Sequence, residues 1–317
     1  MTGGAGFIGS HLVDRLTSLG AEVVVFDNLS TGTLDNLRKA EGLRDLKFVR
    51  DDLLDGDAIA RSLGRCSLVF HLAANPEVRI GVSNSRIDFE QNLVATHNLL
   101  EAMKMSKCAK TIVFASTSTV YGEAKIPTPE DYSPMIPISL YGASKLGCEA
   151  LIMAYCHLFN MRAVIYRFAN VVGSRSKHGV IYDFIKKLKN NPYELEVLGD
   201  GRQRKSYISV EDSVEAFLIG LEKTSDAVGV LNIGSEDYVD VTTIARIVIE
   251  EMKLSNVELK FTGGVQGRGW PGDVKEMLLD ASRIRSLGWR PQHDSGESVR
   301  LAARAILAET DMADHTW

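Results

Sequence analysis

The chain opens on a glycine-rich turn that leads straight into a helix, and this turn constrains the fold more than any other feature. Its glycines, Gly3, Gly4, Gly6 and Gly9 in MTGGAGFIGSHL, fit both a Gly-x-Gly-x-x-Gly and a Gly-x-x-Gly-x-x-Gly spacing. Apolar residues recur through 8–19 at the spacing of an amphipathic helix. The unpaired N–H groups and positive dipole end of such a helix suit a bound phosphate. The pattern therefore predicts a dinucleotide-binding turn.

A carboxylate in the next strand supports this interpretation. Asp27 ends the run 22–27, eighteen residues after Gly9. A carboxylate at that place accepts both ribose hydroxyls of an adenosine and repels a 2′-phosphate, so it predicts NAD rather than NADP. Only Met1 and Thr2 precede the turn, so the strand that normally leads into it is expected to be missing. Either Met1 is not the biological start, or the loss of a central strand leaves the fold marginal.

Apolar runs alternate with helical patterns through the first half of the chain. Runs rich in Val, Ile and Phe, which are typical of buried parallel strands, lie at 22–27, 46–49, 67–74, 110–117 and 162–168. Helical patterns lie at 8–19, 88–106 and 141–159. This alternation predicts an α/β fold with a Rossmann-type doubly wound parallel sheet.

The texture changes after residue 170, where strands shorten and the alternation stops. One more strand is expected at 228–234, and helices are expected at 242–253 and 296–310. We therefore predict a smaller C-terminal lobe packed on the sheet, with a cleft between the two. The cofactor domain is expected to span 1–168 with 206–234 returning to it, and the substrate lobe to span 169–205 and 235–317.

Composition excludes several classes of partner. The net charge of −5 gives no reason to expect nucleic acid or an anionic membrane. No apolar stretch approaches the length of a membrane span, and no signal peptide is expected before the glycines. The four cysteines form no Cys-x-x-Cys pair, so we expect a reduced cytoplasmic protein. Cys156 and His157 point in different directions on a helix, so no metal site is expected.

A Tyr-x-x-x-Lys pattern begins the helix expected at 141–159. Tyr141 and Lys145 share a helix face, so the ammonium is expected to lower the pKa of the phenol. A free phenol is about one part in a thousand ionised at pH 7, and forming the phenolate costs roughly 4 kcal/mol without such help. The phenolate would then serve as a general base for an alcohol proton. Tyr121 and Tyr182 begin the same pattern, and we expect them to be surface or packing residues.

The chain resembles the NAD-dependent epimerase/dehydratase family of extended short-chain dehydrogenases/reductases, and within it the UDP-glucose 4-epimerases most of all. The resemblance runs nearly end to end. It rests on TGGAGFIGSHL (2–12), DNLSTG (27–32), DDL (51–53), HLAA (71–74), Asn92, STSTVYGE (116–123), PISLYGASK (137–145), RFANVVG (167–173), SYISVED (206–212), NIGS (232–235), RGWPGDV (268–274) and LGW (287–289).

The resemblance implies a set of site residues. The catalytic residues would be Thr117, which holds the sugar O4, the base Tyr141, and Lys145, which also binds the nicotinamide ribose. NAD would be bound by Gly3, Gly6, Phe7, Ile8, Gly9, Asp27, Asn28, Leu29, Ser30, Thr31, Gly32, Asp52, Leu53, Leu72, Ala73, Ala74, Asn92, Tyr141, Lys145 and Phe168. The UDP-sugar would be bound by Thr117, Asn170, Val180, Lys205, Arg268, Asp273 and Met277.

The implied reaction is UDP-hexose 4-epimerisation through a 4-keto sugar, with tightly bound NAD. The identity of the sugar, glucose or N-acetylglucosamine, is left open by the resemblance, because Met277 lies where relatives limit room for a 2-acetamido group. A 4,6-dehydratase is the alternative on the same fold, but its Asp-Glu pair is replaced by Ser118 and Thr119. A decarboxylase is disfavoured similarly, and a silent NAD-binding protein would have lost a catalytic residue. A homodimer through helices 88–106 and 141–159 is also implied.

Overall fold

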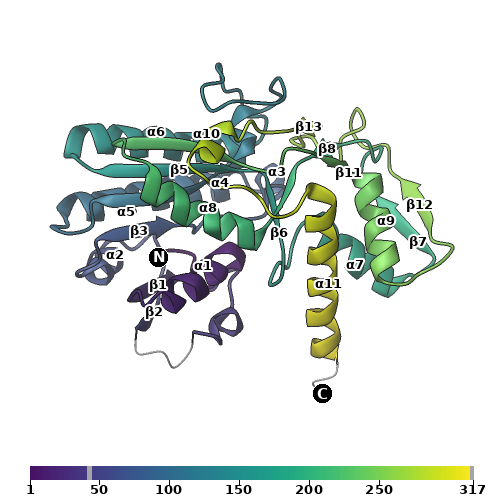
Figure 1. Cartoon of the computed structure of the whole chain (residues 1–317), viewed down its shortest axis with the longest axis horizontal. Coiled ribbons are helices and arrows are strands. Elements are labelled where there is room, and N and C mark those ends of the chain that lie inside the picture. Colours follow the sequence, from purple (N-terminus) through teal and green to yellow (C-terminus); the bar gives the residue numbers. More distant parts are fainter. Residues whose placement is uncertain (41–44, 315–317) are drawn as a thin grey trace.

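The computed structural model describes residues 1–40 and 45–314 and places them in two adjoining parts (Figure 1). The larger part is built on parallel strands that follow in the spatial order β2, β1, β3, β4, β5 and β10, with Thr2 between β1 and β3. Their bounds are β1 Val23–Asp27, β2 Leu46–Arg50, β3 Leu68–His71, β4 Thr111–Thr117, β5 Arg162–Phe168 and β10 Val228–Ile233. The predicted Rossmann-type parallel sheet is confirmed.

The strand expected to be missing is present as two residues at the centre of the sheet. Thr2 forms parallel bridges to both Phe26 of β1 and His71 of β3. Its N–H donates to the Phe70 carbonyl at 2.9 Å, and the Phe26 N–H donates to the Met1 carbonyl at 2.8 Å. No full strand precedes α1 in the described residues, as expected, but the fold keeps one sheet because Met1 and Thr2 alone join its two halves.

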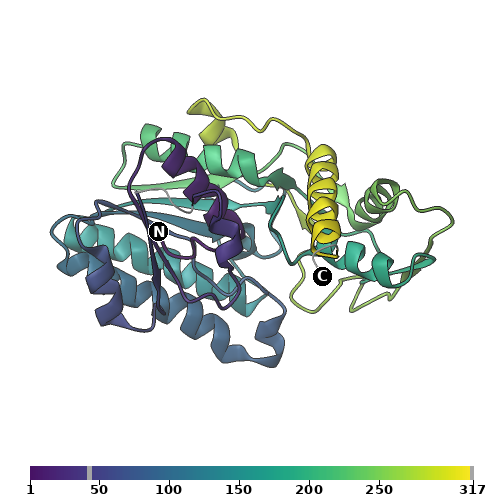
Figure 2. The ribbon, with the colours of Figure 1, turned by 90° about the horizontal axis from the view of Figure 1, so that it is seen from below.

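Helices cover both faces of the sheet (Figures 1 and 2). On one face, α2 Gly56–Leu63, α5 Ala95–Met105 and α6 Leu140–Phe159 pack on Ile112 and Phe114. On the other, α1 Phe7–Ser18, α8 Val210–Lys223 and α10 Ser282–Ser286 pack around Val113 and Val164. Successive residues of β4 thus enter opposite cores, as the alternation of strand side chains requires.

Several expected boundaries differ from the observed ones. The helix expected at 88–106 is split into α4 Ser85–Asp88, the π-helix η2 Phe89–Val94 and α5, with the short α3 Ile80–Ser83 before it. The strand expected at 67–74 ends at His71, and 72–74 line a cavity instead. The first helix, α6, α9 and α11 were expected, whereas α2, α7 and α8 were not singled out.

The smaller part has a core of its own. Helices α7 Val180–Asn190, α9 Val241–Glu251 and α11 Ser295–Asp314 pack with β7 Glu194–Val197 and β12 Glu258–Phe261, which pair in parallel. Short pieces complete the chain: η1 Leu34–Leu37, η3 Ser118–Tyr121, β6 Asn170–Val172, β8 Arg204–Lys205, β9 Tyr207–Ser209, β11 Val239–Asp240 and β13 Glu276–Met277. Segment 206–234 returns to the sheet through α8 and β10, but the exact domain division stays a prediction.

Within 1–40 and 45–314, no helix combines the length and the apolar character needed to cross a membrane.

Candidate active site

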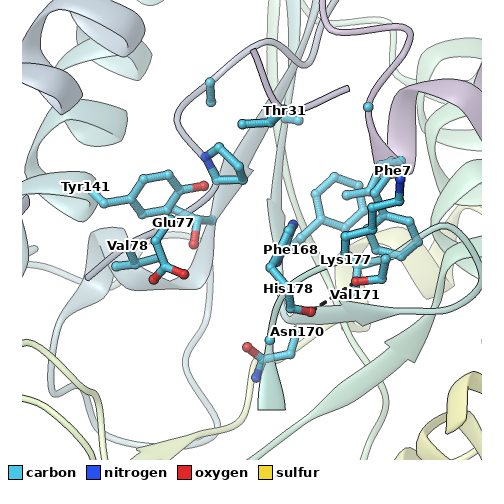
Figure 3. A pocket seen from close by; sticks show the side chains of 18 of the residues that line it. Phe7, Thr31, Glu77, Val78, Tyr141, Phe168, Asn170, Val171, Lys177 and His178 are labelled. Atoms are coloured by element: carbon cyan, nitrogen blue, oxygen red, sulfur yellow. Dashed lines mark hydrogen bonds between the residues drawn. The ribbon is translucent and has the colours of Figure 1, made fainter. Parts of the chain in front are cut away.

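A cavity of about 580 Å³ opens at the carboxyl ends of the strands and reaches the smaller part (Figure 3). This volume lies in the range of small-molecule sites. Most of the expected site residues line it: Gly3, Gly6, Phe7, Ile8, Gly9, Asp27, Asn28, Ser30, Thr31, Asp52, Leu53, Leu72, Ala73, Ala74, Thr117, Tyr141, Lys145, Phe168, Asn170, Val180, Lys205, Asp273 and Met277. Segments that are far apart in the chain therefore meet at one place.

The glycine turn brings bare backbone to the cavity wall. Gly3 has a φ of +68°, and a Cβ there would lie 2.6 Å from the Ala73 backbone nitrogen. A Cβ on Gly9 would lie 2.1 Å from the Gly3 carbonyl oxygen. Helix α1 begins after Gly6 with no side-chain cap, so its first N–H groups are not used by a capping side chain. The turn thus has the free donors and close backbone approach that a pyrophosphate needs.

Asp27 lies at the end of β1, where the adenosine ribose was expected. Its two carboxylate oxygens accept from the Ala5 N–H at 3.0 Å and from the Leu29 N–H at 2.9 Å. These bonds fix the carboxylate, and each oxygen keeps a second lone pair. Asn28 beside it donates from Nδ2 to Asp52 at 2.7 Å, which ties the end of β1 to the end of β2.

The three expected catalytic residues come from two elements. Thr117 ends β4, and its hydroxyl accepts from the Thr119 N–H at 3.2 Å. Tyr141 and Lys145 lie on the first turns of α6, which Ser139 caps by accepting from the Gly142 N–H at 3.0 Å. The Lys145 ammonium donates to the Ala115 carbonyl at 2.8 Å and lies 6.0 Å from the centre of the Tyr141 ring.

The electrostatics of this pair differ from the expectation. Burial raises the pKa of Tyr141, and the Asp88 carboxylate adds to the rise. Burial also lowers the pKa of Lys145, to about 8. In the chain without a ligand the pKa of Tyr141 is therefore raised and not lowered, because desolvation disfavours the phenolate. Positive charge from a bound ligand would act against this rise.

Four expected residues do not line the cavity, among them Leu29 and Gly32. Asn92 is buried; its side chain accepts from the Asn75 N–H at 3.0 Å and donates to the Ser144 hydroxyl at 2.8 Å. It holds the cavity wall from behind instead of facing a cofactor.

Arg268 does not line the cavity, although its neighbour Gly269 does. Its guanidinium forms an ion pair with Glu123 and donates to the Asp273 carbonyl at 2.6 Å. Lys205 is paired as well, with its Nζ 2.5 Å from Asp273 Oδ1. Both cations expected to bind the UDP-sugar are therefore paired with the protein's own carboxylates.

The two other Tyr-x-x-x-Lys patterns lie outside the cavity, as expected. Tyr121 ends η3, is buried, and donates its hydroxyl to Asn232 at 2.8 Å. Tyr182 packs in the core of the smaller part. Within the described ranges, no cluster of His, Cys, Asp and Glu is arranged to hold a metal ion.

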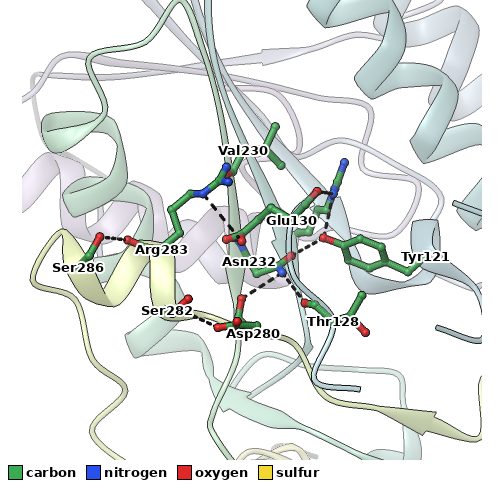
Figure 4. Close-up of polar contacts among 10 residues, drawn as sticks. Tyr121, Thr128, Glu130, Val230, Asn232, Asp280, Ser282, Arg283 and Ser286 are labelled. Carbon is green, nitrogen blue, oxygen red and sulfur yellow. Dashed lines mark hydrogen bonds and ion pairs between the residues drawn. The ribbon is translucent and has the colours of Figure 1, made fainter. Parts of the chain in front are cut away.

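A buried polar network links β4 and α6, the elements that carry Thr117 and Tyr141. Glu149 of α6 forms an ion pair with Arg167 of β5, with Nη2 and Oε2 2.6 Å apart, and also accepts from Ser116 beside Thr117. Arg167 donates onward to the Tyr121 hydroxyl at 2.8 Å. Figure 4 shows Tyr121 meeting Asn232, whose amide also reaches the Thr128 and Asp280 carbonyls at 2.9 and 3.1 Å. Glu130 accepts from the Asn232 N–H at 2.9 Å.

Sequence reasoning missed one wall of the cavity. Pro76, Glu77 and Val78 line it just after β3, and His178 and Trp270 line it from the smaller part. The signal for the first group was the HLAA motif, because residues that follow the carboxyl end of a parallel strand lie at the mouth of such a site.

Comparison with known proteins identifies the family. The model of the NAD dependent epimerase/dehydratase family matches residues 1–234. The chain belongs to this family. It is similar to a putative UDP-glucose 4-epimerase of Methanocaldococcus jannaschii, at 33% identity over 307 residues that cover 95% of each protein. The expected cofactor, NAD, is confirmed, since the family is defined by its dependence on NAD.

Solved structures agree with this membership. A crystal structure of a UDP-galactose 4-epimerase is 43% identical, has a TM-score of 0.86, and is matched over 100% of this chain and 98% of that one. A UDP-glucuronic acid 4-epimerase from Bacillus cereus, in complex with UDP-glucuronic acid and NAD, is 29% identical with a TM-score of 0.87, over 97% and 98% of the two chains. Family members of the same shape therefore act on different sugars.

Proposed function

We propose that the protein is a UDP-hexose 4-epimerase that interconverts UDP-glucose and UDP-galactose. The observation that carries the proposal is the placement of Thr117, Tyr141 and Lys145 on the wall of one cavity that the glycine turn and Asp27 also line. This set can remove a proton from a hydroxyl and hold the resulting oxygen in place. The curated relative and the solved UDP-galactose 4-epimerase support the same reaction.

In the proposed reaction the Tyr141 oxygen takes the proton of the sugar C4 hydroxyl, while the Thr117 hydroxyl holds O4. Lys145, together with the positive charge of the bound cofactor, is proposed to stabilise the phenolate against the burial that raises the pKa of Tyr141. When bound, NAD would accept the hydride from C4 of the sugar and later return it. Once the 4-keto sugar has turned about its diphosphate and presents its other face, Tyr141 gives the proton back to O4.

The rest of the cavity is proposed to hold the nucleotide and the diphosphate. Asn170, Val180, Asp273 and Met277 line the smaller part's side and are assigned to the UDP-sugar. Lys205 and Arg268 would bind the diphosphate only after giving up Asp273 and Glu123 as partners. A diphosphate is a strong competitor for these cations, because it offers more charge than one carboxylate.

A 4,6-dehydratase is the alternative in the same family. It needs an acid and a base beside the residue that holds O4, and here the two residues after Thr117 are Ser118 and Thr119. Neither hydroxyl can act as that pair at neutral pH. The alternative thus lacks its chemical groups in this chain.

The test is incubation of the purified protein with UDP-glucose, UDP-galactose and their N-acetyl counterparts, with the products separated by chromatography. An epimerase forms the C4 epimer without accumulating NADH. Loss of water from the sugar would identify a dehydratase, and a silent binding protein would form no product.

We also propose a homodimer that pairs the 88–106 and 141–159 helices across a two-fold axis. Supporting this, α6 is apolar around much of its circumference and leaves Ala143, Ala150 and Ala154 exposed along one side. Small side chains let helices approach closely.

A further inference from the structure

The lysines and arginines that line the cavity differ in how far the chain already uses their charge. They are Arg79, Lys145, Arg175, Lys177 and Lys205. Lys145 donates to a backbone carbonyl at 2.8 Å. Each of the others except Lys177 forms an ion pair with a carboxylate of the chain, at 2.5 to 2.9 Å. The donors of these cations are therefore engaged within the protein, apart from those of Lys177.

Lys177 is exposed, and Figure 3 draws it among the side chains that line the cavity. It makes no hydrogen bond or ion pair with any other residue of 1–40 and 45–314. An ammonium carries three donors, and all three are free here. Lysines without a partner are ordinary on a protein surface, but this one borders a cavity that has to accept the two phosphates of NAD.

The loop that carries Lys177 is anchored to both parts of the molecule. The Ser174 carbonyl accepts from Nε2 of His11, on α1, at 3.1 Å. The Arg175 N–H donates to the carboxylate of Glu309, on α11, at 2.9 Å. The backbone just before Lys177 is thus held in place, so its long side chain can turn toward a ligand without a movement of the loop.

The charge balance of the cavity wall shows why a free cation matters. Carboxylates outnumber the lysines and arginines of the lining, and they lie at Asp27, Asp51, Asp52, Glu77, Asp183 and Asp273. A diphosphate would therefore meet a wall of negative net charge. An ammonium forms charge-assisted hydrogen bonds with phosphate, which are stronger than neutral ones. Lys177 can form them without breaking an ion pair, whereas Lys205 and Arg268 first have to give up their carboxylates.

We infer that the Lys177 ammonium binds a diphosphate in this cavity. The diphosphate is either the pyrophosphate of NAD or that of the UDP-sugar, since both present the same phosphate oxygens to an ammonium. The inference deepens the proposed function, and its UDP arm rests on it. Lys177 would act in binding and not in proton transfer, because it holds a ligand by the group about which the sugar is proposed to turn.

The test is Lys177→Gln, which removes the charge and keeps most of the side chain. The matched control is Lys186→Gln, because Lys186 is exposed on α7, lies outside the cavity, and loses the same charge. UDP is titrated into each purified holoenzyme by calorimetry, and the rate at which bound NAD is lost is followed by gel filtration. In Lys177→Gln alone, we expect the Kd for UDP or the rate of NAD loss to rise at least about tenfold.

The two arms identify the ligand. A weaker affinity for UDP assigns Lys177 to the substrate diphosphate, and a faster loss of NAD assigns it to the cofactor pyrophosphate. In the arm that changes, Lys177→Arg should restore most of the affinity, because it keeps the charge. Added salt should weaken binding more in the wild type than in Lys177→Gln, because screening acts on the charge that the variant lacks.

These measurements separate the inference from the proposed reaction, because neither depends on turnover. If Lys177→Gln matches the control in both arms, or if Lys177→Arg does not restore the loss, the role of Lys177 is overturned even in an active epimerase. A loss that arginine restores supports that role even if the protein turns over neither UDP-glucose nor UDP-galactose.

Discussion

At the scale of single residues, the proposed base Tyr141 has to ionise at a place where burial disfavours its charged form. Burial and Asp88 both raise the pKa of Tyr141, and burial brings the pKa of Lys145 down to about 8. The chain therefore supplies the acid–base pair without the full electrostatic support that the phenolate needs. That support is expected to come with the bound cofactor, whose oxidised nicotinamide carries positive charge. We therefore expect Tyr141 to act as a base only when the cofactor is bound.

Replacing the proposed base tests this assignment. Tyr141→Phe removes the proton-accepting oxygen, so epimerisation is expected to fall by several orders of magnitude while NAD and UDP still bind. Turnover is measured by chromatography, and binding by calorimetry. The matched control is Tyr182→Phe, which changes a tyrosine of the same Tyr-x-x-x-Lys spacing outside the cavity and leaves turnover near normal. Near-normal turnover in Tyr141→Phe would reject the base.

A second prediction at this scale concerns the turn. A Cβ at residue 9 would lie 2.1 Å from the Gly3 carbonyl oxygen, so Gly9→Ala must push the turn apart. We expect weaker NAD binding, together with a lower melting temperature. Gly20→Ala is a poor match because of its positive φ, whereas Gly56→Ala meets no atom within 4 Å and serves as the control. Equal NAD affinity in both variants would contradict the role of the glycine turn in binding the pyrophosphate.

The sequence could predict which residues line the site where a motif fixes the relative position of its own side chains. The Tyr141–Lys145 spacing on a helix and the strand that ends at Thr117 were enough to bring three side chains to one wall. Arg268 and Asn92 could not be placed in this way. Their orientation depends on Glu123 and on Asn75 and Ser144, which are distant in sequence, and no local pattern shows which partner a side chain chooses.

At the scale of elements, one buried ion pair holds α6, the helix that carries the proposed base, against the sheet. Glu149 and Arg167 are both almost wholly buried and join α6 to β5, and Glu149 also accepts from Ser116 of β4. A buried pair is costly to break, because the remaining charge has no solvent to stabilise it. The relative position of Tyr141 and Thr117 therefore depends on a contact two helical turns away from the tyrosine.

Breaking this pair should destabilise the protein. Glu149→Gln leaves Arg167 buried without its counter-charge, and we expect the free energy of unfolding to fall by about 3–5 kcal/mol, measured by urea denaturation. Glu215→Gln breaks the half-exposed pair with Arg15 and should cost no more than about 1 kcal/mol. A loss in Glu149→Gln as small as in the control would mean that the buried pair is not structurally important.

The centre of the sheet predicts a pH dependence. His71 of β3 lies between the hydroxyls of Thr2 and Thr96, and burial lowers its pKa to about 3. Between about pH 6.5 and 3 the unfolded chain binds a proton that the native protein does not, so stability falls as the pH falls. We expect His71→Gln to reduce this slope by up to about 1.4 kcal/mol per pH unit, measured as unfolding free energy against pH. The same slope in the variant would exclude His71 as its source.

Element types could be predicted from periodicity more readily than their interruptions. The strands of the sheet read as Val- and Ile-rich runs, but the helix expected at 88–106 is broken by the π-turn of η2. That break follows Asp88, whose carboxylate is bound by Asn75 from another segment. The spacing of apolar residues does not depend on such a tertiary contact, so it could not predict the break in the helix.

At the scale of the whole molecule, the prediction is that two copies associate through α5 and α6. Ala150→Glu puts a charge on the exposed side of α6, and we expect it to give monomers in analytical ultracentrifugation where the wild type is a dimer. Ala60→Glu changes an exposed alanine on α2 and should leave the dimer intact. A monomeric wild type, or a dimeric Ala150→Glu, would count against this interface.

The shared anchor of Glu149 has a practical consequence for redesigning this scaffold. One carboxylate holds both the helix that carries Tyr141 and the strand that carries Thr117, whereas the loop at Pro76–Val78 makes no hydrogen bond to Glu149 and is held through Asn75. A mutagenesis library aimed at new sugars can therefore vary Pro76–Val78 first. It should leave Ser116, Glu149 and Arg167 untouched, since altering any of them would disturb the reaction geometry in every member at once.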